Sequence, residues 1–394
     1  MGRYIRAFFR KVGEAFRKGD LILLLMCVVL NIFGILMVAS TTNQMGPVRY
    51  LVIQSVAACL GILMYVLISS IDTEFFSEHR YWLVVFNCFL LLMLLPFGTD
   101  NGTGNKSWLD FPFLPIDIQP AEICKITYIL VMASVMASFQ NRISSVRAVF
   151  TMVFHLGLLA GLNMVLSEDL GVTLIFVFIF VGMAFSGGVN LIWFGAAIGG
   201  IAVLFPILWN FLDGYQRLRI EILFNPDLDP LGTGARYHTV RALRSLTGGG
   251  MTGQGLFQGH RTQTEGALFA QHTDYIFAAI GEELGFVGCA LVVLALLAII
   301  IRIIWVGTRS QDYMRRLVCF GAASALIFQV TSNIGMCIGI TPVIGLTLPF
   351  ISYGGSSLVT LYTMLGLVSG VYARPTPTSM ERYVQPPYMY RVKR

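Results

Sequence analysis

The chain has 394 residues, of which 56% are hydrophobic and only 12% are charged. Because soluble domains carry about 25% charged residues, this composition excludes an ordinary soluble domain and predicts a polytopic membrane protein. The formal net charge of +6 does not indicate a nucleic-acid partner, because the basic residues are spread over loops between apolar runs, where membrane topology explains them.

Residues 1–20 form a basic, mildly amphipathic segment ahead of the first apolar run. Lys and Arg alternate there with Tyr, Ile, Val and Phe at near-helical spacing. This pattern is typical of a helix that lies on an anionic inner leaflet, so we predict contact with membrane lipids. The run that begins at Leu21 is long enough to span a bilayer and no small-residue cleavage site follows it, which predicts a first span and not a cleaved signal peptide.

The apolar runs that follow are long enough for about ten membrane-spanning helices. The predicted spans are 21–40, 50–69, 81–97, 121–139, 148–166, 170–186, 189–212, 284–306, 317–340 and 344–372. We therefore predict an all-α polytopic membrane protein with a ten-helix membrane domain over 21–372. Its longest polar interval, 213–283, forms a large loop between the seventh and eighth helices.

The distribution of Lys and Arg predicts which side of the membrane each loop occupies. One side collects the basic segment 1–20, most of the Arg-containing short loops and the short basic tail 373–394, whereas the short loops of the other side hold only Arg49 and Lys106. Basic residues in short loops concentrate on the cytoplasmic side. Both termini are therefore predicted to be cytoplasmic, and the large loop 213–283 extracytoplasmic.

The fourth predicted span begins with an acid and a base on one helical face. Pro120 suits the first position of a helix, after which Glu122 and Lys125 lie at i and i+3 and can form an ion pair. A paired acid and base are tolerated within a span where isolated charges are not. Two roles are open for this pair: a structural lock between helices, or contact with a substrate.

Asp169 opens the sixth predicted span. A negative charge is favoured at the start of a helix, but Glu168 precedes Asp169 and could serve that purpose equally well. We therefore interpret Asp169 as a candidate for substrate contact.

The large loop opens with Arg217 and Arg219, just past a predicted span. Their forked guanidinium groups could clamp a phosphate or pyrophosphate, although anchoring at the membrane interface is an equally compatible role. The Gly-rich run 248–255 lacks the Lys-Ser/Thr ending of a nucleotide-binding P-loop and follows no predicted strand. We interpret it as a flexible loop.

Near the end of the large loop, His272, Thr273 and Asp274 are consecutive. Thr273 is a suitable helix cap, which would place Asp274 in the first helical turn as a capping acid. The neighbouring His272 and the acidic pair Glu282 and Glu283 favour instead a site with shifted pKa values. Both interpretations are open at this stage.

Sequence strings spread over nearly the whole chain carry a resemblance to a known family. They include Gln119-Pro120-Ala121-Glu122, Gly214-Tyr215-Gln216-Arg217, His272-Thr273-Asp274-Tyr275-Ile276-Phe277 and Pro349-Phe350-Ile351-Ser352-Tyr353-Gly354-Gly355-Ser356-Ser357. In combination, the last two strings are highly specific. The chain resembles the shape, elongation, division and sporulation family. The resemblance implies a peptidoglycan glycosyltransferase of the bacterial cytoplasmic membrane that polymerises lipid II for elongation, division or sporulation.

The same resemblance implies that Asp274 is the essential catalytic acid of this family. Joining an acceptor hydroxyl to the anomeric carbon of a lipid-pyrophosphate-linked donor needs a general base on the hydroxyl and positive charge on the leaving pyrophosphate. We expect Asp274 to be the base, Arg217, Arg219 and Lys125 to hold the pyrophosphate, and Glu122 to orient Lys125. The remaining candidates for substrate contact are Asp169, His272 and Thr273.

The resemblance also implies a partner, a class B penicillin-binding protein that supplies transpeptidase activity. This chain has no Ser-x-x-Lys with Lys-Thr-Gly of its own. Two other functions are compatible with charges inside a membrane domain: a flippase or other transporter of lipid II, and a non-catalytic scaffold that activates a penicillin-binding protein. The sequence specifies no cofactor. The Asp, Glu and His residues near the large loop are compatible with a divalent cation, but no spacing among them specifies a site.

Departures from the family pattern cluster between Ala235 and Ala270. Relatives carry Leu-Pro-Glu where this chain has Leu268-Phe269-Ala270, and Ala235-Arg236 are inserted. Because Asp274 and the basic candidates are all present, we expect glycosyltransferase activity despite these changes.

Overall fold

The structure is a computed structural model, and it describes residues 13, 18–99, 106–110, 117–211, 214–229, 232–234 and 236–374. The predicted amphipathic segment 1–20 falls almost entirely outside the described residues, as does the predicted tail 373–394 beyond Arg374.

The regular secondary structure of the described residues is helical except for one short antiparallel pair of strands, β1 and β2. In chain order the elements are α2 (Leu21–Thr41), η1 (Asn43–Met45), α3 (Pro47–Ser69), α4 (Thr73–Glu78), α5 (Arg80–Leu92), α6 (Leu94–Phe97), β1 (Gly98–Thr99), β2 (Trp108–Leu109), α7 (Pro120–Ser138), η2 (Gln140–Arg142), α8 (Val146–Ser167), α9 (Leu170–Ser186), α10 (Leu191–Phe211), α11 (Gly214–Phe224), η3 (Pro226–Leu228), α12 (Tyr237–Gly248), α13 (Ile276–Arg309), α14 (Tyr313–Cys337) and α15 (Gly355–Ala373).

The apolar runs become helices because, in hydrocarbon, every backbone N–H and C=O must be bonded within its own segment. Among the described residues, eight helices are long and apolar enough to cross a membrane, and two more apolar stretches, Leu170–Ser186 and Leu191–Ile207, are shorter. The predicted class, an all-α polytopic membrane protein, is thus confirmed. The count of ten crossings stays a prediction.

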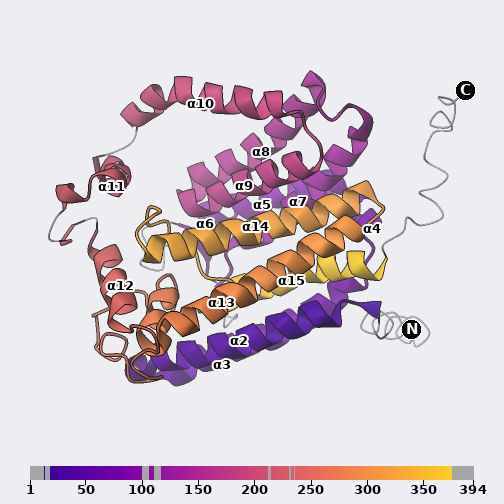
Figure 1. The fold of residues 1–394 in the computed structure, drawn as a ribbon. Helices are drawn as coiled ribbons and strands as arrows, with labels where there is room; N and C mark the ends of the chain where they lie inside the picture. Colours follow the sequence, from indigo (N-terminus) through magenta and orange to yellow (C-terminus); the bar gives the residue numbers. More distant parts are fainter. Residues whose placement is uncertain are drawn as a thin grey trace, which may run out of the picture.

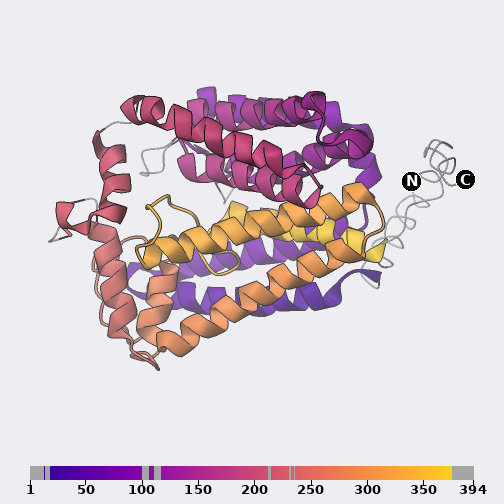
Figure 2. The same ribbon diagram turned by 45° about the horizontal axis from the view of Figure 1, so that its top comes forward.

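The helices form one bundle in which α14 and α7 connect two groups. Helices α2, α3, α13 and α15 pack together on one side of α14, and α5, α8 and α9 lie with α7 on the other (Figure 1, Figure 2). Helix α10 lies apart from the bundle along most of its length (Figure 1), and most of its side chains are exposed. Its first turn is held where Trp193 Nε1 donates to the Ser144 carbonyl at 3.0 Å.

The start of α2 and the end of α15 lie at the same end of the bundle. The Asp20 N–H donates to the Ser369 hydroxyl at 3.0 Å, and the Asp20 carboxylate is paired with Arg302 of α13 at 2.8 Å. Helices α11 and α12 lie at the opposite end (Figure 1). The two ends of the bundled chain therefore lie at one end of the bundle, and the side of the membrane that this end faces stays a prediction.

The helix boundaries differ from the prediction after α14. The predicted span 344–372 is wrong over 344–354, because α14 ends at Cys337 and α15 begins only at Gly355. Between them Gly339 and Gly345 adopt positive φ angles of 78° and 63°, which favour glycine and interrupt a right-handed helix. A non-helical loop, residues 338–354, therefore reaches into the end of the bundle that carries α11 and α12.

The Gly-rich run 248–255 is hydrogen-bonded to α13, so its interpretation as a flexible loop is wrong. The N–H groups of Gln254 and Gly255 donate to the carbonyls of Glu282 and Glu283 at 3.0 and 2.9 Å. These bonds form because α13 is interrupted at Gly285, whose φ of 66° and ψ of −165° free the preceding carbonyls. The start of α13 at Ile276 also makes residues 276–283, assigned to the large loop, helical.

Replacing Gly285 by Ala is expected to lower the stability of the fold by about 1–3 kcal/mol, because this backbone conformation is almost exclusive to glycine. An added Cβ would also lie only 2.6 Å from the carbonyl carbon of Met251. The control is Gly157→Ala in α8, where a Cβ meets no heavy atom within 4 Å and Ala favours the helix by up to about 1 kcal/mol. The thermal unfolding midpoints of the purified variants in detergent check this; equal midpoints would contradict it.

Candidate active site

A buried ion pair lies at the start of α7. Lys125 Nζ is 2.7 Å from Glu122 Oε1, and each residue is only 4% exposed. The Thr360 hydroxyl of α15 donates to the second carboxylate oxygen of Glu122 at 2.9 Å. The predicted pair is thus confirmed, with Pro120 at the first helical position. Because Glu122 is bonded from another helix, the pair joins α7 to α15 as well as placing an ammonium group in the bundle.

Asp169 caps α9, whereas Glu168, which could have served the same purpose, does not. Asp169 Oδ1 accepts the Val172 N–H at 3.0 Å, as an N-cap side chain does. Glu168 has a left-handed φ of 55° and ends α8, whereas Asp169 has the extended backbone that an N-cap needs. The second oxygen of Asp169 accepts Gln119 Nε2 at 3.3 Å, which brings the starts of α9 and α7 together.

The backbone of residues 272–274 is held by hydrogen bonds from α14 and from the 338–354 loop. The His272 carbonyl accepts the Tyr353 N–H at 2.8 Å, and the Thr273 carbonyl accepts the Ser352 hydroxyl at 2.6 Å. The Asp274 carbonyl accepts Asn333 Nδ2 at 2.8 Å. These bonds fix the backbone around Asp274 without using its carboxyl group.

Thr273 does not cap α13, so that interpretation is wrong. The helix begins at Ile276 with Tyr275 as its cap residue, and the Thr273 hydroxyl donates back to the Ala270 carbonyl at 3.3 Å. Ala270 itself has a positive φ of 46°, so the chain turns sharply just before the helix. Asp274 consequently precedes the first turn, and its carboxyl is not a capping group.

The Asp274 carboxyl is electrostatically suited to proton transfer near neutral pH. It remains partly exposed, but loss of hydration and, secondly, the neighbouring Asp169 charge raise its pKa to about 6. Burial, together with the nearby Glu122 carboxylate, also raises the pKa of Asp169. Burial lowers the pKa of His272, which favours the neutral ring. At pH 7 most of the Asp274 side chains are therefore ionised but retain an appreciable affinity for a proton.

Asp169 links the ion pair of α7 to Asp274. Its charge acts on the pKa of Asp274, and the charges of Glu122 and Lys125 act in turn on the pKa of Asp169. The 338–354 loop lies alongside: a Cβ on Gly345 would be 3.6 Å from Asp274 Oδ2. The structure thus brings four of the predicted site residues, Glu122, Lys125, Asp169 and Asp274, into one electrostatically coupled group.

The two candidate arginines of the large loop are placed differently. Arg217 Nη2 donates to the carbonyl of Asn210 at 3.0 Å, which ties α11 to the end of α10. Arg219 belongs to α11, but its side chain lies outside the described part of the structure. In the described ranges, no hydrogen bond or ion pair joins Arg217 to the group around Asp274. A pyrophosphate-binding role for either arginine stays a prediction.

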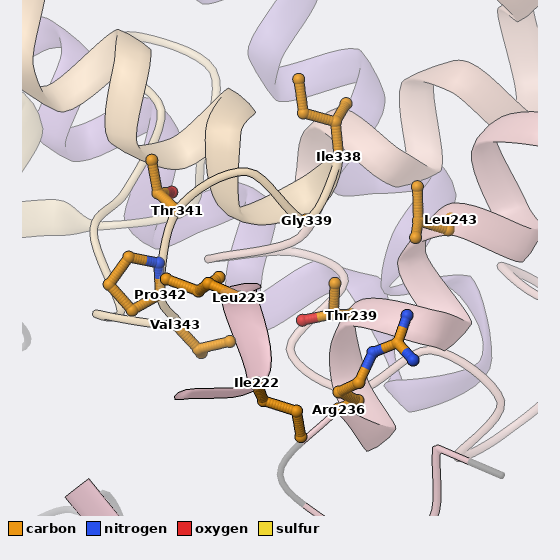
Figure 3. A pocket seen from close by; sticks show the side chains of 10 residues that line it. All are labelled: Ile222, Leu223, Arg236, Thr239, Leu243, Ile338, Gly339, Thr341, Pro342 and Val343. Carbon is orange, nitrogen blue, oxygen red and sulfur yellow. The ribbon is translucent and has the colours of Figure 1, made fainter. Parts of the chain in front are cut away.

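A cavity of about 190 Å³ opens between α11, α12 and the 338–354 loop. Figure 3 shows Pro342 and Val343 on one side and Arg236 and Thr239 on the side of α12. The cavity adjoins the loop segment that carries Gly345, next to Asp274. No sequence pattern predicts this cavity, because the interval that contains α11 and α12 has the composition of a loop.

The acidic pair Glu282 and Glu283 belongs to a separate buried network. Both residues are fully buried, and Glu283 accepts the hydroxyl groups of Ser40 and Thr262 at 2.7 and 2.6 Å. This network ties α2 to the large loop. Within the described ranges, no group of three or more His, Cys, Asp or Glu residues could hold a metal ion.

Sequence reasoning missed Asn333 and Thr360, which bond Asp274 and Glu122 from α14 and α15. Their only signal was polarity inside an apolar run, and such residues are costly in a membrane unless they are bonded.

Comparison with known proteins identifies the family. The family model described as cell cycle protein, which covers FtsW, RodA and SpoVE, matches residues 20–375. The chain is 31% identical over 360 residues to the peptidoglycan glycosyltransferase MrdB of Escherichia coli K12, covering 90% of this chain and 93% of that protein. It is also 31% identical over 367 residues to the probable peptidoglycan glycosyltransferase FtsW of Geobacter metallireducens, covering 90% and 95%.

Comparison with solved structures supports the same family. A chain of a peptidoglycan synthase complex, described as coordinating polymerization and crosslinking, superposes with a TM-score of 0.76 at 28% identity, over 90% of this chain and 97% of that one. The Thermus thermophilus rod shape determining protein RodA superposes with a TM-score of 0.67 at 25% identity, over 91% and 97%. The resemblance seen in the sequence strings is thereby confirmed, and the chain belongs to the FtsW/RodA/SpoVE family of cell cycle proteins.

Proposed function

We propose that this chain is a peptidoglycan glycosyltransferase that polymerises lipid II, an undecaprenyl-pyrophosphate-linked disaccharide peptide, at the outer face of the bacterial cytoplasmic membrane. Its relatives carry this enzyme class in their names. The observation that carries the proposal is the Asp274 carboxyl, which the backbone bonds leave free, which has a pKa of about 6, and which is coupled to a buried acid–base pair.

The reaction follows from these groups. Asp274 removes the proton from the acceptor sugar hydroxyl, and that oxygen attacks the anomeric carbon of the donor. The bond from this carbon to the pyrophosphate oxygen breaks, so the lipid pyrophosphate leaves and the configuration inverts. Lys125, oriented by Glu122, offsets the developing negative charge together with Arg217 and Arg219.

The other candidates act around this centre. Asp169 keeps the pKa of Asp274 high, while His272 and Thr273 contact substrate beside it.

Ten crossings with both termini in the cytoplasm would place the large loop and Asp274 outside. The position of α11 and α12 opposite the start of α2 supports this topology (Figure 1).

The partner we propose is a class B penicillin-binding protein, which would crosslink the strands that this chain makes. The likeness to a chain of a peptidoglycan synthase complex supports a two-protein assembly. Membrane lipids surround the exposed apolar helices.

The test is to purify the chain with its penicillin-binding protein, supply lipid II and resolve the products on a gel that separates glycan strands. We expect strands from the wild-type complex. Absence of strands would contradict the proposal and favour a scaffold. Movement of lipid II across vesicles by protein that makes no strands would favour a flippase.

The polymerisation rate is expected to fall as the pH is lowered through about 6, because protonated Asp274 cannot accept the proton of the acceptor. Asp169→Asn removes a neighbouring negative charge and keeps a good N-cap. The ionised form of Asp274 is then favoured, so its pKa falls and the acid limb moves to lower pH. The pH dependence of kcat, measured for the wild type and for Asp169→Asn, checks this. If kcat falls at the same pH in both proteins, Asp169 does not raise the pKa of Asp274.

A further inference from the structure

Gln54 is a fully buried amide inside α3, a predicted membrane-spanning helix. Both halves of the amide are bonded to the 338–354 loop. Its Nε2 donates to the Ser352 carbonyl at 3.1 Å, and its Oε1 accepts the Gly354 N–H at 3.2 Å. A buried polar side chain in such a helix is costly unless it is hydrogen-bonded. Here the two hydrogen bonds fix the backbone of a loop and not a neighbouring side chain.

The loop segment held by Gln54 is the one that holds the residues before Asp274. The Tyr353 N–H bonds the His272 carbonyl, and the Ser352 hydroxyl bonds the Thr273 carbonyl. The Ser352 hydroxyl also accepts the Leu348 N–H at 2.8 Å, which closes the turn. A continuous series of hydrogen bonds thus runs from α3 through residues 352–354 to the segment 272–274.

The loop is tightly constrained from another side as well. Phe350 has a positive φ of 65°, which a bulky residue adopts only when its surroundings impose it. Helix α2 lies so close that a Cβ on Gly34 would be 2.7 Å from the Ile351 Cα. The position of residues 352–354, and therefore of 272–274, is set by α2 and α3 together.

We propose that Gln54 is a positioning residue for glycosyl transfer: its amide holds residues 352–354, and through them the Asp274 carboxyl, at the place where it meets the acceptor hydroxyl. This role rests on the proposed function. A displacement of a reacting group by about 1 Å can cost about 100-fold in rate. Removal of the amide is therefore expected to displace Asp274 and to lower the rate, although Gln54 touches no substrate.

Gln54→Met keeps the length of the side chain and removes both hydrogen bonds. We expect kcat to fall by about 10- to 100-fold with KM changed by less than about threefold. The acid limb of the pH profile should move below about 6, because a loosened Asp274 gains hydration. Hydrogen exchange of residues 346–354 and 270–275 should become faster.

Asn31→Leu is the matched control. Asn31 is a buried amide of α2 whose Nδ2 donates to the Tyr362 hydroxyl at 3.4 Å and not to the loop. The Asn31→Leu variant should change neither the acid limb of the pH profile nor the hydrogen exchange of residues 270–275. If Gln54→Met does not fold, Ser352→Ala removes the next bond of the series, and the same results are expected of it.

Three results would overturn the inference. Wild-type kcat in Gln54→Met would do so, as would a fall in kcat that matches a loss of folded protein while the acid limb stays in place. In both cases the wild-type protein still polymerises, so the proposed function stands. A wild-type protein that makes no glycan would overturn the proposed function and the positioning role with it.

Discussion

Asp274→Asn is expected to lower the rate of lipid II polymerisation by about 10²- to 10⁴-fold, the usual contribution of a general base. Asn has nearly the shape of Asp but cannot accept the proton. The fold should persist, because Asn333, Ser352 and Tyr353 bond the backbone carbonyls of residues 272–274 and not the carboxyl. Initial rates with labelled lipid II measure the loss, and copurification of the penicillin-binding protein reports on the fold.

The control for this variant is Asp227→Asn, an exposed acid of η3 in the same large loop. It removes the same charge from the same end of the molecule, and its rate should equal that of the wild type. An Asp274→Asn variant that polymerises lipid II at the rate of this control would contradict the assignment of Asp274 as the general base.

The second large effect is expected at the buried pair of α7. Glu122→Gln leaves the Lys125 ammonium with 4% exposure and without its carboxylate at 2.7 Å. Breaking a buried pair by removing one partner costs about 3–5 kcal/mol. We therefore expect a marked fall in the thermal unfolding midpoint and loss of polymerisation in this single variant.

The double variant Glu122→Gln, Lys125→Met separates the two roles that are open for the pair. Removing both charges leaves no uncompensated ion, so most of the stability should return. If Lys125 offsets charge on the pyrophosphate, polymerisation stays about 100- to 1000-fold below the wild-type rate. Recovery of activity together with stability would instead show that the pair is a structural lock only.

The parts of the fold that depend on local pattern were predictable. Hydropathy alone identified the span-length runs, since a helix in a bilayer depends mainly on the length and apolarity of its own segment. The pairing of Glu122 with Lys125 followed from their i, i+3 spacing. The family strings singled out Asp274, although its role remains a proposal.

The remainder depends on partners far away in the chain. Asn333 bonds Asp274 across 59 positions, Thr360 bonds Glu122 across 238, and Gln54 bonds Gly354 across 300. No periodicity encodes such pairs. Thr273 carries a capping side chain, yet its carbonyl is bonded to the 338–354 loop and α13 begins only at Ile276.

The interpretation of the Gly-rich run 248–255 as a flexible loop is wrong for a related physical reason. Glycines indicate conformational freedom in an isolated segment, but here they permit close approach, since a Cβ on Gly253 would lie 2.6 Å from the Leu284 Cα. Whether glycine gives mobility or tight packing depends on what lies opposite, and α13 lies opposite this run.

Formation of glycosidic bonds by this chain through Asp274 is tested most directly by one comparison of products. Purified wild-type and Asp274→Asn complexes with the same penicillin-binding protein are given lipid II, and the glycan strands are resolved on a gel. We predict strands from the wild-type complex and, over the same reaction time, at least about 100-fold fewer from Asp274→Asn. Equal strands from both complexes, or none from the wild type, would contradict this account.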